Sequence, residues 1–108
     1  EQSYNNMALI KCYQEKETAL KEKIIKRLQH IYDNISSLSG KDAEVEMIDS
    51  IKAAQKSWES YVTNHCAYSY IDNARIHPPS QSLEIIRCRV GKTKERLNEI
   101  NSDYRVQH

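Results

Sequence analysis

Glycine, proline and phenylalanine are scarce in this 108-residue sequence, which has two Gly, two Pro and no Phe. So few turn-forming residues leave little of the turn chemistry that a β-sandwich or a β-barrel needs. Long apolar runs are also missing, since no stretch approaches the ~20 residues that cross a bilayer. We therefore expect an all-α fold in one domain spanning 1–108, with the modest core that so short a chain can bury.

The sequence also lacks a large excess of positive or negative charge, since it has 16 basic and 15 acidic side chains. This balance gives no global electrostatic case for a nucleic acid or an anionic membrane as partner. The basic residues near the end of the chain (Arg87, Arg89, Lys92, Lys94 and Arg96) do not form one helix face, so we interpret them as solvated rather than as a nucleic-acid stripe. The chain begins at Glu1 rather than Met, which fits a mature form without its leader or a shortened chain.

What the sequence does contain is helical periodicity in three segments, which predicts helices over about 6–38, 43–68 and 81–101. The expected core stripe of the first comprises Leu20, Ile24, Leu28, Ile31, Ile35 and Leu38. That of the second comprises Met47, Ile51, Ala54, Trp58, Tyr61 and Cys66 (or His65). That of the third comprises Leu83, Ile86, Val90, Leu97 and Ile100, and Tyr104 continues the series.

Two breaks separate these segments and predict an antiparallel three-helix bundle with one long loop between the second and third helices. The first break is short and contains Gly40, which can end a helix in the left-handed conformation. The second spans 69–80 and includes Pro78-Pro79, which we expect to lie in the loop. Gly91, inside the third helix, is interpreted as a point of close approach to a neighbouring helix.

The three cysteines fall near one end of such a bundle. Folding the helices about residues 40 and 76 brings Cys66 near the levels of both Cys12 and Cys88. A Cys66–Cys88 bridge would close a loop of about 20 residues and contribute roughly 3 kcal/mol. Cys12–Cys66 is the competing pair, and three reduced thiols are the third possibility. No Cys-x-x-Cys spacing supports a redox motif or a zinc ribbon.

Three motifs occur in order along the chain. They are Leu28-Gln29-His30-Ile31-Tyr32, then Ala54-Gln55-Lys56-Ser57-Trp58 with Tyr61 and Cys66, then Cys88 with Thr93 and Arg96. Together they resemble the LprI-type lysozyme-inhibitor family, a group of small secreted or periplasmic bacterial helical domains, over roughly 7–100. Departures are Val62-Thr63 and His65, where the family often has Arg-Asp and Glu, and the absence of a further Cys before Cys12. This last departure favours Cys66–Cys88, with Cys12 free.

The resemblance implies a periplasmic or secreted protein, with its signal peptide removed, that binds and inhibits a lysozyme or another cell-wall-degrading enzyme. It also implies a buried polar contact between Gln55 and Arg96. The alternatives are an immunity protein against a delivered toxin and a scaffolding domain of an envelope assembly. We expect no enzymatic activity, cofactor, metal, nucleic acid or membrane insertion.

Candidate sites can be weighed from the same residues. Trp58 and Tyr61 could anchor a partner, but their place on the apolar stripe favours core packing. Polar groups in the long loop (Asp72, Asn73, Arg75 and His77) are the better candidates for partner binding, because two prolines and a nearby disulfide would preorganise them. The alternative is a solvated connector.

Chemistry of other kinds finds little support. His65 and Cys66 are adjacent on a helix and point about 100° apart, so they do not form a nucleophile pair. Metal binding by His65, His77 and Cys12 lacks any recognised ligand spacing. No pair of carboxylates indicates acid–base catalysis.

Overall fold

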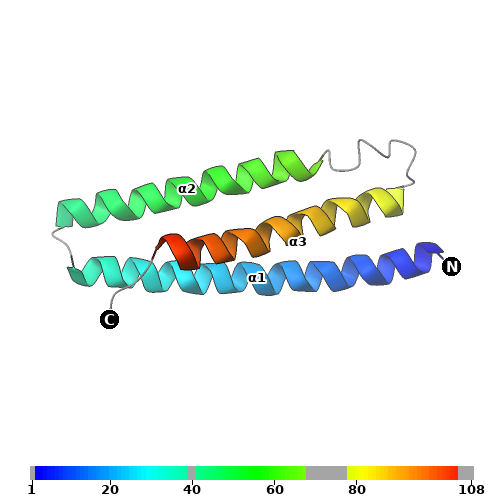
Figure 1. Ribbon diagram of the computed structural model, residues 1–108, viewed down its shortest axis with the longest axis horizontal. Coiled ribbons are helices and arrows are strands. Elements are labelled where there is room, and N and C mark those ends of the chain that lie inside the picture. The colour runs from blue at the N-terminus through cyan, green and yellow to red at the C-terminus, as the bar shows by residue number, and fades with distance from the viewer. Residues whose placement is uncertain (1, 39–40, 68–77, 105–108) are drawn as a thin grey trace.

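Three long helices run up, down and up in the computed structural model, which describes residues 2–38, 41–67 and 78–104, with side-chain surroundings for 7–36, 42–67 and 83–104. They are α1 (Gln2–Leu38), α2 (Lys41–Ala67) and α3 (Pro78–Asp103). Helix α2 returns antiparallel to α1, and α3 then lies parallel to α1 (Figure 1). The molecule is a rod of 58 × 22 × 17 Å. The predicted all-α three-helix bundle is confirmed.

The start of α3 differs from the prediction. Pro78 is the first residue of the helix, whereas the sequence placed Pro78, Pro79 and Ser80 in the loop. Proline fits the first helical turn because its fixed φ suits the helix and its missing N–H would have no partner inside the helix. The proline pair therefore begins a helix here instead of continuing the loop.

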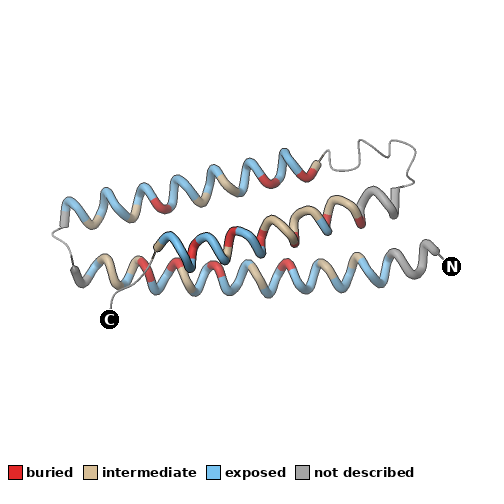
Figure 2. Tube along the Cα trace, in the orientation of Figure 1, coloured by how far each residue is buried: buried red, intermediate tan, exposed pale blue. Residues whose placement is uncertain are grey.

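The core lies mainly between α1 and α3. One cluster joins Ile24, Leu28 and Ile31 of α1 to Ile51 of α2 and Ile100 of α3. A second cluster comprises Leu83, Ile86 and Val90 of α3, against which Ile10, Tyr13 and Leu20 of α1 pack. Figure 2 shows the buried positions following the line along which α1 and α3 meet.

Helix α2 buries much less than its sequence predicted. Its buried apolar residues are Ile51, Val62 and Cys66. The prediction was wrong for three stripe positions, Met47, Ala54 and Tyr61, and for the alternative position His65, because all four are exposed. Their side of the helix turns away from the line through Ile51, Gln55, Val62 and Cys66, along which α2 meets its neighbours.

Gly91 does not mark a close helix approach. A Cβ atom built at Gly91 has no heavy atom of a neighbouring element within 4 Å, so the space beside it is open. The interpretation from the sequence is therefore wrong at this position.

In the part of the chain that the structure describes, no helix is both long enough and apolar enough to cross a membrane.

Candidate functional site

A disulfide joins the end of α2 to α3. Cys66 and Cys88 are bonded across 22 positions of sequence, with their Cα atoms 5.6 Å apart. Cys66 is completely buried. Cys12 is a free, exposed thiol on α1. The bridge therefore ties together the two helices that flank the long loop, with the pairing that the family resemblance favours.

A polar contact lies further along the same two helices. Arg96 Nε donates to Gln55 Oε1 at 2.9 Å, and Arg96 Nη1 donates to Glu99 Oε1 at 2.5 Å. Arg96 is buried, and its third nitrogen, Nη2, has no hydrogen-bond partner within the described part of the chain. Gln55 and Arg96 thus fix the position of α2 on α3 through a side-chain bond that the apolar core does not provide.

A buried carboxylate links α1 to α3. Glu17 receives two hydrogen bonds from Arg89, from Nε at 2.9 Å and from Nη2 at 3.0 Å, and Lys21 Nζ lies 3.6 Å from Glu17 Oε2. Thr93, almost wholly buried, donates its hydroxyl to the Arg89 carbonyl at 2.7 Å. Burial alone would raise the pKa of Glu17, but the hydrogen bonds and charges of Arg89 and Lys21 outweigh it and lower the pKa.

These groups border a pocket of about 380 Å³ that is lined by residues of all three helices. Its lining is Glu17, Lys21, Ile24, Ile25, Gln55, Trp58, Glu59, Val62, Thr63, Arg89 and Thr93. Trp58, the only tryptophan, is half-buried in this wall. The pocket therefore combines an aromatic ring and aliphatic side chains with two carboxylates, an amide and two cations.

Tyr61 and His65 lie together on the exposed surface near the disulfide. Their rings stack with centroids 5.3 Å apart, and Lys92 Nζ lies 5.8 Å from the Tyr61 ring centroid. Tyr61 is 50% exposed, so it is available to a partner rather than part of the core.

The remaining motif residues serve the fold. Leu28 is buried in the α1–α3 core, and Tyr32 packs at its edge, with Lys52 Nζ 5.6 Å from its ring centroid. The loop residues proposed from the sequence (Asp72, Asn73, Arg75 and His77) lie outside the described residues. Within the described part of the chain, no group of three His, Cys, Asp or Glu could hold a metal ion.

The Glu17–Arg89 pair is the feature that sequence reasoning missed. Arg89 was grouped with the solvated cations of the third helix. Yet Glu17 precedes Leu20 by three residues and therefore continues the core stripe of α1. A carboxylate in line with core residues predicts a buried partner, and that signal was present.

Four of the motif residues, Gln55, Cys66, Cys88 and Arg96, thus lie where α2 meets α3. Residues 1–100 match the family model described as lysozyme inhibitor LprI. The chain belongs to the LprI family. No curated protein and no solved structure matches it.

Proposed function

We propose that this LprI-family chain acts outside the cytoplasm and binds and inhibits a lysozyme or another cell-wall-degrading enzyme, without catalysing a reaction itself. The match over residues 1–100 to a family of lysozyme inhibitors carries the proposal. The disulfide supports the location, because such bonds form and persist in oxidising compartments.

The second half of α2 is the surface best suited to a partner. Trp58 lines the pocket, Tyr61 lies half-exposed beside His65, and α2 ends at Ala67, directly before the loop that holds Asp72. Aromatic side chains dominate the energetics of many interfaces. The disulfide joins α2 to α3, the helices that precede and follow Asp72 in the sequence.

An inhibition assay tests this proposal directly. A molar excess of the wild-type chain should slow the lysis of cell walls by a lysozyme. W58A and the triple variant D72A/R75A/H77A should each weaken inhibition at least 10-fold, since hot-spot truncations cost about 2 kcal/mol or more. V45A alters an exposed apolar residue near the other end of α2 and should inhibit like the wild type.

The outcomes test the inhibitory function and the proposed binding surface separately. Unchanged lysis in the presence of the wild-type chain would refute enzyme inhibition. Full inhibition by both W58A and the triple variant would keep the function but remove this surface. Thermal unfolding monitored by circular dichroism checks that each variant is folded.

A further inference from the structure

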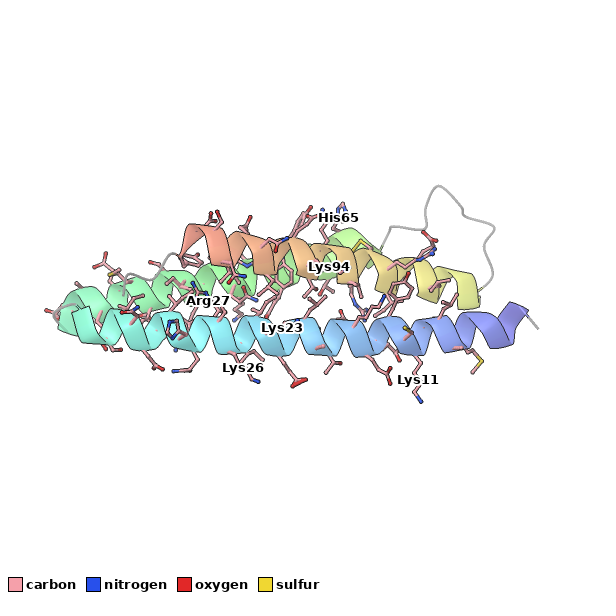
Figure 3. The ribbon with its side chains drawn as sticks, turned by 60° about the horizontal axis from the view of Figure 1, so that its bottom comes forward. Lys11, Lys23, Lys26, Arg27, His65 and Lys94 are labelled. Atoms are coloured by element: carbon pink, nitrogen blue, oxygen red, sulfur yellow. A yellow bond between two sulfur atoms is a disulfide. The ribbon has the colours of Figure 1, made fainter. Side chains whose placement is uncertain are left out.

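Cations gather along the outer line where α1 and α3 meet, on the side away from α2. We call this group the cationic seam; it comprises Lys16, Lys23 and Arg27 of α1 with Arg87 and Lys94 of α3. Figure 3 looks onto the seam, with Lys23 and Arg27 on α1, Lys94 on α3 above them, and α2 behind.

Heptad spacing keeps these side chains on one face. Lys16 and Lys23 are seven residues apart on α1, and Arg87 and Lys94 are seven apart on α3. Seven residues make almost two helical turns, so each pair repeats on the same side about 10 Å further along. Arg87 donates to the Tyr13 hydroxyl at 3.4 Å, which fixes the two helices side by side at this level.

The seam has few internal counter-charges. Among the described residues, Lys23 and Lys94 form no ion pair or hydrogen bond. Lys16 lies over the Tyr13 ring at 5.1 Å, and Arg87 has a 3.6 Å contact with Glu84.

Arg27 adds a further guanidinium to this face. Its Nη2 donates to the Tyr104 carbonyl at 3.5 Å, and its buried Nε has no hydrogen-bond partner among the described residues. Like charges held close together repel one another, so this face gains from an external anion.

The opposite side of the molecule carries the opposite charge. Acidic residues of α2 (Asp42, Glu44, Glu46, Asp49 and Glu59) outnumber its described side-chain cations, Lys52 and Lys56. The formal net charge of +1 therefore conceals a separation of charge between α2 and the seam. An anionic surface would orient such a molecule with the seam towards it and α2 away from it.

We propose that the cationic seam docks the molecule lengthwise on an anionic phospholipid surface. The two rows run along the 58 Å axis of a rod, so a flat array of headgroups reaches both at once. A strand of nucleic acid would call for a concave groove with stacking aromatic rings. Leu9, seven residues before Lys16 and 44% exposed, adds an apolar contact at the end of one row. In this orientation the pocket and Tyr61 on α2 stay accessible to a protein partner.

Co-sedimentation with vesicles tests the proposal. The full chain should bind vesicles of equal parts phosphatidylglycerol and phosphatidylcholine at about 0.01 M salt, where the Debye length is about 30 Å. It should release them at about 1 M salt, where that length is about 3 Å. Vesicles of phosphatidylcholine alone should not bind the chain.

A pair of charge-matched variants locates the surface. K23Q/K94Q should lower the partition coefficient about 25-fold, since each of the two cations near an anionic membrane contributes about fivefold. K52Q/K56Q removes the same charge from exposed positions of α2 and should bind like the wild type.

Two results would overturn the proposal. One is wild-type binding to the anionic vesicles that is no stronger than to the neutral ones at low salt. The other is an equal loss in both double variants, which would show a response to net charge alone. Neither result depends on whether the chain inhibits an enzyme, so this test and the inhibition assay fail independently.

Discussion

Helix α3 and helix α2 are attached to α1 in different ways. Apolar side chains of α3 from Leu83 to Ile100 pack along α1 over most of the rod. Among the described residues, helix α2 contributes only Ile51 to the two core clusters, and Figure 2 shows its surface as mostly exposed. The pairing of α1 with α3 therefore rests on continuous burial, and that of α2 rests on a few specific links.

Those links involve residues of the motifs that resemble the LprI family. Cys66 is bonded to Cys88, and Gln55 accepts a hydrogen bond from Arg96. These two contacts hold α2 on α3, and the outer face of α2 stays exposed.

Truncating the α1–α3 core should have the largest effect. Ile100 is fully buried, so I100A should lower the free energy of unfolding by about 3–4 kcal/mol, through lost burial and the cavity left behind. Urea denaturation measures the loss. V45A, at a side chain that is 57% exposed, should change stability by less than about 0.5 kcal/mol. A similar loss in both variants would contradict the difference between the two regions.

Removing the disulfide should loosen α2 selectively. C66A/C88A should cost about 3 kcal/mol, because the bonded residues are separated by 22 positions of sequence. Native-state hydrogen exchange should accelerate in α2 more than in α1, since α2 has few other contacts. C12A changes an exposed thiol and should leave both measurements as in the wild type. Uniform acceleration in all three helices would show that α2 is not a separately opening element.

Neutralising the buried carboxylate should have a smaller effect that depends on pH. E17Q should cost about 1–2 kcal/mol near neutral pH, because it loses the charge-assisted bonds while Arg89, 38% exposed, can still meet water. E15Q alters an exposed carboxylate on the same helix and serves as the control.

The sign of the pH dependence follows from the lowered pKa of Glu17. A carboxyl group whose pKa is lower in the folded chain stabilises it fully above the unfolded value, near 4.5, and loses this contribution as the pH falls towards the folded value. The stability difference between the wild type and E17Q should therefore be constant above about pH 6 and shrink steadily below about pH 4.5. Urea titrations at a series of pH values measure it. A difference that grows in acid would reverse the assigned shift.

Periodicity predicted the helices and most of the α1–α3 core, because apolar residues spaced three and four positions apart lie on one side of a helix. It did not predict how much of that side a neighbour covers. Tyr61 belongs to the apolar stripe of α2 and is nevertheless half-exposed, since α2 meets its neighbours along the line through Val62 and Cys66.

The site was predicted less completely than the fold. The Gln55–Arg96 contact could be inferred only from a motif. The apolar periodicity of the two helices does not indicate which residue either side chain contacts. Glu17 lies in line with the core stripe of α1, and its partner nearby in the sequence is Lys21. Its longer-range partner, Arg89, lies 72 residues away and depends on the packing of α3 on α1, which periodicity alone does not define.

The smallest expected effect concerns Gly91, where a gain in stability is expected. Glycine in a helix interior costs about 1 kcal/mol relative to alanine, and a Cβ at this position meets no heavy atom of another element within 4 Å. G91A should therefore raise the free energy of unfolding by about 0.5–1 kcal/mol, mainly by restricting the unfolded chain. Urea denaturation at neutral pH, with N98A as an exposed alanine control on the same helix, measures the gain. A loss of stability would show that a neighbour does approach Gly91, as the sequence alone suggested. A gain would agree with the open space beside Gly91.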